Sequence, residues 1–167
     1  MAGIGFDVGW AFSERHMPAV RDAIGSIPTR IFLDVATAPV ERDQHEATDL
    51  VLRVSGGDVA VRIRKRAALW DCPEWSVRVR SRGGHKTELD KLLGGFCRWY
   101  FFGYGDGHDG LFAWWLLDLD VVRSAGVLAE TWPRHTNHDG SVGMYIPLSS
   151  LAALECIVFD GPNAIAV

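Results

Sequence analysis

The sequence predicts a mixed α/β fold in which helices flank a central mixed β-sheet. Three observations lead to this prediction. The 167 residues are 48% hydrophobic, which is enough for one well-packed core. The middle of the chain alternates hydrophobic and polar residues with the period of a β-strand. Short segments with helical spacing lie on both sides of it, and no repeat or linker divides the chain, so residues 1–167 are expected to form a single domain.

The N-terminal third predicts a helix, a strand and a second short helix. Residues 13–25 have helical spacing, with Ser13 as a candidate N-cap and Gly25 as the stop, although Pro18 lies inside the pattern. Residues 30–35 are expected to form a strand. Residues 39–48 are polar with scattered hydrophobic positions and are expected to form the second helix.

The middle of the chain predicts a β-hairpin followed by a third strand. Residues 50–54 and 59–66 alternate on either side of Ser55–Asp58, a four-residue turn that contains two glycines. Residues 74–80 alternate in the same way. The sequence therefore predicts that all three strands lie in one sheet.

The remaining elements are expected to be short helices, turns and two very hydrophobic strands. Residues 96–104 and 111–119 are too hydrophobic for half-exposed strands, so we expect them to be buried on both faces. The other expected elements are a helix at 87–93, a turn at 103–110, helical turns near 120–125 and 148–153, and a hairpin turn at 137–140.

The net charge of −4 conceals a basic middle segment. Between Arg53 and Arg98 there are 11 Lys and Arg residues against 5 Asp and Glu residues. In each of two expected strands the arginines share one face, because alternate side chains of a strand point the same way. This pattern predicts an arginine-rich sheet face that binds the phosphate backbone of a nucleic acid. The residues of this predicted face are Arg62, Arg64, Arg66, Arg78, Arg80 and Arg82.

The expected order of elements over residues 39–118, αβββαβ, resembles the core of the restriction-endonuclease-like, PD-(D/E)XK superfamily. In that superfamily, carboxylates and a lysine hold a divalent metal ion and activate water against a phosphodiester. The resemblance implies that Asp49 and Glu46 are metal ligands for Mg²⁺ or Mn²⁺. It also implies that Lys65, with these two carboxylates, belongs to the catalytic group.

This chain departs from the superfamily's motif at the acidic–x–Lys triplet. Arg62 stands at the acidic position and Arg64 at the lysine position. Because an arginine cannot ligate a metal ion, the sequence predicts a degenerate or rearranged metal site, with Glu46 or Glu88 as replacement ligands. The resulting hypothesis is a nuclease-like protein that binds nucleic acid and has weak or no nuclease activity.

Two other hypotheses are compatible with the sequence. In the first, the protein is a non-catalytic structural protein or adaptor, and its arginine face pairs with carboxylates of the chain itself or of a protein partner. A weaker alternative is a metal hydrolase built on His135, His138 and Asp139. Turn formation is the simpler interpretation of that cluster, and also of the cluster of Asp106, His108 and Asp109, because both contain Asp-Gly.

Cysteine content and hydropathy indicate where the chain is expected to reside. The three cysteines, Cys72, Cys97 and Cys156, are too few and too far apart for a disulfide framework. No hydrophobic run has the length of a membrane helix, and no secretory signal precedes the first helix. A cytoplasmic protein without a membrane partner is therefore expected.

Overall fold

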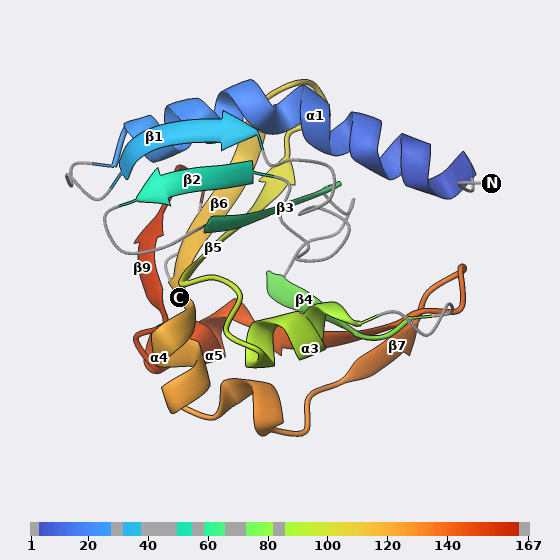
Figure 1. The fold of residues 1–167 in the computed structure, drawn as a ribbon. Coiled ribbons are helices and arrows are strands. Elements are labelled where there is room, and N and C mark those ends of the chain that lie inside the picture. Colours follow the sequence, from blue (N-terminus) through green and yellow to red (C-terminus); the bar gives the residue numbers. More distant parts are fainter. Residues whose placement is uncertain are drawn as a thin grey trace.

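The computed structural model has a mixed α/β fold, as the sequence predicts (Figure 1). It describes residues 4–27, 32–37, 50–54, 59–65, 73–81 and 86–163. Among these residues, no helix combines the length and the hydrophobicity that a membrane span requires. The expected helix at 39–48 lies outside the described residues.

The strands form three sheets. A four-stranded sheet has the order β3-β5-β6-β9, a three-stranded sheet has the order β4-β8-β7, and β1 pairs with β2. The four-stranded sheet comprises β3 (Val59–Lys65), β5 (Trp99–Gly105), β6 (Leu111–Asp118) and β9 (Ile157–Asp160). The other strands are β1 (Phe32–Thr37), β2 (Leu50–Val54), β4 (Glu74–Arg80), β7 (Arg134–Thr136) and β8 (Val142–Pro147).

The helices lie on opposite sides of these sheets (Figure 1). The long helix α1 (Ile4–Gly25) covers one side, and the short helices lie with the three-stranded sheet on the other. The short helices are α3 (Glu88–Leu93), α4 (Leu119–Ser124) and α5 (Leu148–Ala153), with a 3₁₀ turn at Val127–Ala129. The predicted start of the first helix at Ser13 is wrong, because α1 begins at Ile4 and accommodates the exposed Pro18 in its interior.

The two hydrophobic strands are buried on both faces, as predicted. One face of the four-stranded sheet packs against α1, and Phe101 and Leu116 belong to this part of the core. The opposite face packs against the three-stranded sheet and the short helices, and Phe102 and Trp115 belong to that part. The four-stranded sheet is therefore the middle layer of the molecule.

The predicted αβββαβ core with one sheet is not confirmed. The three strands expected to share a sheet lie in three different ones: β2 pairs with β1, β3 pairs in parallel with β5, and β4 pairs with β8. Because β5 is buried, its backbone N–H and C=O groups need partners on both edges, and β3 and β6 supply them. Pairing β3 with β4 would also have placed arginines opposite one another, which is destabilising.

Position 105, at the end of β5, requires a glycine because the strand lies very close to α1 there. A methyl group at this position would overlap the ring of the buried His16, whose Nδ1 donates to the Phe12 carbonyl oxygen at 2.8 Å. The sequence alone predicts a turn that begins at Gly103, but β5 continues to Gly105, and the turn begins at Asp106.

We expect Gly105→Ala to lower the free energy of unfolding by about 1–3 kcal/mol, because overpacking a filled site forces neighbouring groups to move. Gly25→Ala is the matched control: nothing lies within 4 Å of the added methyl group. Urea unfolding of both variants measures the difference. Equal stability of the two variants would contradict the close packing of His16 on β5.

Candidate functional site

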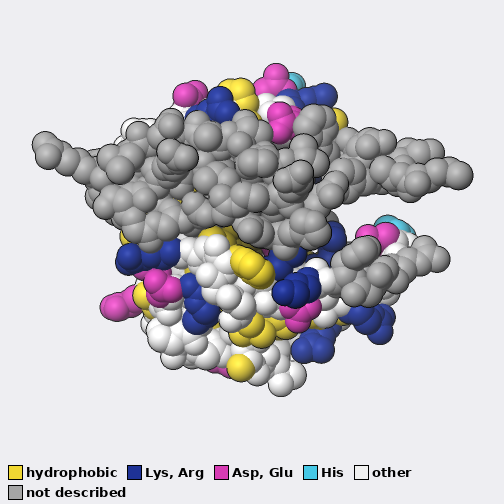
Figure 2. All heavy atoms as spheres, viewed as in Figure 1, with side chains coloured by type: hydrophobic (Ala, Val, Ile, Leu, Met, Phe, Trp, Pro, Cys, Tyr) yellow, Lys and Arg dark blue, Asp and Glu magenta, His cyan; other side chains and the backbone are white. Residues whose placement is uncertain are grey.

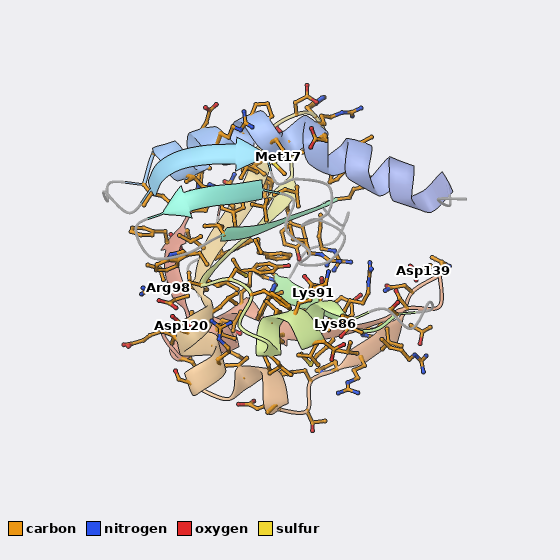
Figure 3. The ribbon with its side chains drawn as sticks, viewed as in Figure 1. Met17, Lys86, Lys91, Arg98, Asp120 and Asp139 are labelled. Atoms are coloured by element: carbon orange, nitrogen blue, oxygen red, sulfur yellow. The ribbon has the colours of Figure 1, made fainter. Side chains whose placement is uncertain are left out.

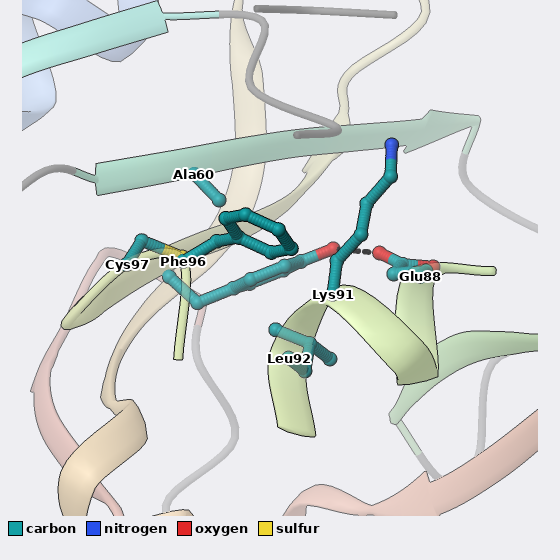
Figure 4. Close-up of a pocket in the computed structure, with 7 residues that line it drawn as sticks. Ala60, Glu88, Lys91, Leu92, Phe96 and Cys97 are labelled. Atoms are coloured by element: carbon teal, nitrogen blue, oxygen red, sulfur yellow. Dashed lines mark hydrogen bonds between the residues drawn. The ribbon is translucent and has the colours of Figure 1, made fainter. Parts of the chain in front are cut away.

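Helix α3 places two ionisable side chains, Glu88 and Lys91, in the interior. Thr87 caps the helix in a capping box, in which its side chain accepts from the Asp90 N–H and Asp90 accepts from the Thr87 N–H. This cap fixes the start of the helix directly before Glu88. Glu88 and Lys91 are spaced i, i+3 and rise from the same side of α3 (Figure 4), and they are 7% and 8% exposed.

The Glu88 carboxylate binds groups from three strands. Its Oε2 accepts from Arg62 Nη1 of β3 at 2.6 Å and from the Arg78 backbone N–H of β4 at 2.9 Å. Its Oε1 accepts from the Tyr100 hydroxyl of β5. Both carboxylate oxygens are therefore engaged. We call Glu88 and its three donors, Arg62, Tyr100 and the Arg78 backbone N–H, the carboxylate cluster. It connects the four-stranded sheet to the three-stranded sheet.

The carboxylate cluster keeps Glu88 ionised. Burial alone raises the pKa of Glu88, but the Arg62 charge, followed by the hydrogen bond from Tyr100, outweighs this effect. The hydrogen bond from the Arg78 N–H adds to the net lowering of the Glu88 pKa below its ordinary value. Burial and the adjacent Glu88 charge raise the pKa of Tyr100 well above its ordinary value, so Tyr100 remains a hydrogen-bond donor.

The cavity beside this cluster is too small for a substrate. It has a volume of about 10 Å³, close to the least that holds one water molecule. Its lining residues are Ala60, Glu88, Lys91, Leu92, Phe96, Cys97 and Tyr100. A closely packed environment around a buried ion pair is typical of a structural element of the core.

Two predicted site residues have partners within the fold. Arg62, which the sequence assigns to the phosphate-binding face, pairs with Glu88 because β3 packs its polar face towards β4 and α3. Glu88, which the sequence offers as a replacement metal ligand, accepts hydrogen bonds at both of its oxygens. Over the residues that the structure describes, no three His, Cys, Asp or Glu side chains come together in a group that would hold a metal ion.

Arg64 is also directed towards the three-stranded sheet. Its Nη1 donates to the Ser76 hydroxyl of β4, and its guanidinium carbon lies 5.9 Å from the centre of the Tyr145 ring of β8. The alternation predicted for β3 is confirmed, since Val61 and Ile63 are buried on the opposite face. Arg64 remains half-buried, so part of its side chain reaches solvent.

Arg78 and Arg80 are the arginines of β4 that project into solvent. Both are exposed, whereas Val77, on the side of β4 that faces the core, is fully buried, as the alternation predicts. Within the described part of the chain, neither guanidinium has a carboxylate within 4 Å. In Figure 2, several basic side chains are visible in the region where Figure 1 labels β4 and β7, as they are elsewhere on this side of the molecule. We call Arg64, Arg78 and Arg80 the basic sheet face.

Other predicted site residues lie elsewhere. Asp49, Glu46, Arg66 and Arg82 are outside the described residues. Lys65 is exposed at the end of β3, where its Nζ lies 5.6 Å from the centre of the Phe12 ring of α1. Lys65 is therefore directed towards α1, and the carboxylate cluster lies on the other side of β3.

The two His- and Asp-containing clusters form turns. Asp106 Oδ1 accepts from the backbone N–H groups of His108 and Gly110 at 2.8 and 3.2 Å. Asp139, at the tip of the turn between β7 and β8 (Figure 3), accepts from the Ser141 N–H and hydroxyl at 2.9 and 2.7 Å. These local hydrogen bonds confirm the interpretation as turns, and they also lower the pKa values of Asp106 and Asp139.

Sequence reasoning missed three polar residues around the arginines, namely Tyr100, Ser76 and Tyr145. Tyr100 had a detectable signal, because a tyrosine in a strand that is buried on both faces requires a partner for its hydroxyl. Ser76 shares the face of Arg78 by simple alternation. Tyr145 had no detectable signal in the sequence, because its proximity to Arg64 depends on the pairing of β4 with β8.

Comparison of the sequence with protein-family models and with curated proteins identifies no relative. No protein-family model matches the sequence, and no curated protein matches it significantly. The class of protein is defined by the fold and the site together: a mixed α/β fold with a buried carboxylate cluster and an exposed basic sheet face.

Proposed function

We propose that this protein binds nucleic acid by contacting the phosphate backbone with its basic sheet face. The observation that carries the proposal is the exposure of Arg78 and Arg80 on one strand, with no carboxylate within 4 Å of either guanidinium in the described part of the chain. Asp139 is the nearby acidic residue whose pKa the Arg78 charge helps to lower. Arginine guanidinium groups suit phosphate because they donate two parallel hydrogen bonds to its oxygens. Arg64 adds a third positive charge beside them.

The carboxylate cluster supports this function indirectly. Glu88 accepts the Arg78 backbone N–H, so the strand that carries the exposed arginines is fixed to α3 and to β3. A positioned strand loses less conformational entropy when its arginines bind phosphate. In this proposal Arg62 maintains the fold, and Arg78 and Arg80 contact the ligand.

Binding of the purified protein to fluorescently labelled duplex DNA, single-stranded DNA and RNA tests the proposal. We expect measurable affinity at low salt that decreases steeply as salt is added, because phosphate binding releases counterions. The absence of binding to all three probes at low salt would refute the proposal.

We further propose that the protein is nuclease-like in the sense of the PD-(D/E)XK resemblance, with a degenerate metal site. Asp49 and Glu46 remain its candidate ligands, with Lys65 as the candidate catalytic cation, and Mg²⁺ or Mn²⁺ is the implied metal. The engagement of Glu88 by Arg62 supports degeneracy, because it removes one replacement carboxylate from metal binding.

We expect Mg²⁺- or Mn²⁺-dependent cleavage of DNA or RNA to be absent or very weak. Metal-assisted hydrolysis requires oxygen ligands around the metal, whereas Arg62 supplies a fixed positive charge at the motif's acidic position. Incubation with plasmid, linear and single-stranded DNA and with RNA measures this activity. Efficient cleavage that Asp49→Ala abolishes would show that the metal site is complete.

A second candidate function is a non-catalytic adaptor that binds a carboxylate-rich protein surface. The Arg62–Glu88 pair favours it, since it shows that the polar side of β3 accommodates a carboxylate. Retention on an acidic polypeptide such as polyglutamate, together with no retention on nucleic acid, would favour this function over the first.

A further inference from the structure

The three-stranded sheet carries an aromatic pair on the same face as Arg78. In the register of the sheet, Arg78 of β4 lies opposite Gly143 of β8, and Gly143 lies opposite His135 of β7. Residues directly opposite one another share a face of the sheet, and Tyr145 shares it too because it is two residues from Gly143. Arg78, His135 and Tyr145 therefore project on one side of the sheet.

Gly143 leaves room for the Tyr145 ring in the middle of this row. A methyl group at Gly143 would lie 3.1 Å from Tyr145 Cε2, so the ring lies over the glycine. The His135 ring packs against it edge-on, with the ring centres 5.2 Å apart and the planes at 73°. His135 is exposed and Tyr145 is half-buried, so this aromatic pair is accessible from solvent.

Positive charges flank the aromatic pair. The Arg64 guanidinium carbon lies 5.9 Å from the centre of the Tyr145 ring, and Arg78 is on the neighbouring strand. Arginines beside exposed aromatic rings are typical of surfaces that bind the backbone of a single strand and stack its bases. The bases of a duplex are already stacked on one another and are not available for such contacts.

We infer that the preferred ligand is single-stranded nucleic acid, with a base stacked on the Tyr145–His135 pair and phosphates bound by Arg64 and Arg78. This inference rests on the proposed function, since it specifies which nucleic acid the basic sheet face binds. The base supplies the contact that a phosphate backbone alone lacks.

Fluorescence anisotropy with three labelled DNA probes of equal length tests this inference. The probes are a thymidine single strand, an abasic single strand with the same number of phosphates, and a duplex. We expect the thymidine strand to bind at least about fivefold more tightly than the abasic strand, the lower end of what one stacked base contributes. His135→Ala and Tyr145→Leu should reduce this preference, whereas Tyr145→Phe should retain it.

His135→Ala keeps the test decisive if Tyr145→Leu fails to fold, because His135 is exposed. Equal binding of the thymidine and abasic strands by the wild-type protein would overturn the inference and leave phosphate binding intact. A preference that survives both His135→Ala and Tyr145→Leu would also overturn it. Failure of all three probes to bind would refute the proposed function itself.

Discussion

Replacing Glu88 with glutamine should destabilise the protein by about 3 kcal/mol, the lower end of the cost of breaking a buried ion pair. The variant removes the charge that faces Arg62, whose side chain is only 28% exposed. It also presents an amide N–H₂ group to a site where Tyr100 and the Arg78 backbone already donate. Urea unfolding followed by tryptophan fluorescence measures the loss.

Asp120→Asn is the matched control, since it also converts an ion-paired carboxylate to an amide. Asp120 accepts from Arg123 at 2.6 Å and lies 3.7 Å from Arg98 (Figure 3), but its side chain is 60% exposed. Exposed ion pairs contribute little, so the control should cost less than about 1 kcal/mol. Equal losses in Glu88→Gln and Asp120→Asn would contradict the structural role of the carboxylate cluster.

The stabilisation by Glu88 should also depend on pH. Because the pKa of Glu88 is lowered in the folded protein, its contribution is complete above the pKa of the unfolded chain, about 4.3. It is lost as pH falls through the lower, folded value. The difference in stability between wild type and Glu88→Gln should therefore be constant near neutral pH and smaller at about pH 3. A difference that is the same at both pH values would contradict an ionised Glu88.

Replacing Arg78 and Arg80 together with glutamine should reduce affinity for nucleic acid by about a hundredfold at low salt, because each of the two lost charged hydrogen bonds to phosphate contributes about 1.5 kcal/mol. Both side chains are exposed, so their loss should leave the free energy of unfolding nearly unchanged. Fluorescence anisotropy measures the affinity, and urea unfolding measures the stability.

The control for this double variant is Arg15→Gln with Arg21→Gln. It changes the net charge equally, but both residues are exposed on α1, on the opposite side of the molecule from β4 (Figure 1). The control should lose much less affinity than Arg78→Gln with Arg80→Gln. Equal losses in the two double variants would mean that net charge, and not the basic sheet face, determines binding.

Local periodicity predicted which side chains share a face, but not which strands pair. The alternation of Val61 and Ile63 with Arg62 and Arg64 is correct, because it depends only on backbone geometry within one strand. The pairing of β3 with β5 is a contact between distant parts of the chain, and no local signal specifies it. The predicted Ser55–Asp58 turn lies outside the described residues, and the strands on either side of it pair with β1 and β5.

The sequence predicted which arginines point away from the hydrophobic side of their strands, but it did not predict the different contacts that each of them makes. Alternation identified Arg62, Arg64, Arg78 and Arg80 as outward from the hydrophobic side of their strands, which is correct. It assigned them one function because it placed β3 and β4 in one sheet. Once the two strands lie in different sheets, Arg62 faces Glu88, and Arg78 and Arg80 face solvent. The division of the arginines is thus a property of the tertiary structure.

The salt dependence of nucleic-acid binding tests most directly whether Arg78 and Arg80 bind phosphate while Arg62 maintains the fold. The slope of log K against log salt should be about 1.8 shallower on duplex DNA, or about 1.4 on a single strand, for Arg78→Gln with Arg80→Gln than for the wild type. These values correspond to the loss of two phosphate contacts. A slope identical to that of the wild type would contradict the account, because it would mean that neither exposed arginine contacts phosphate.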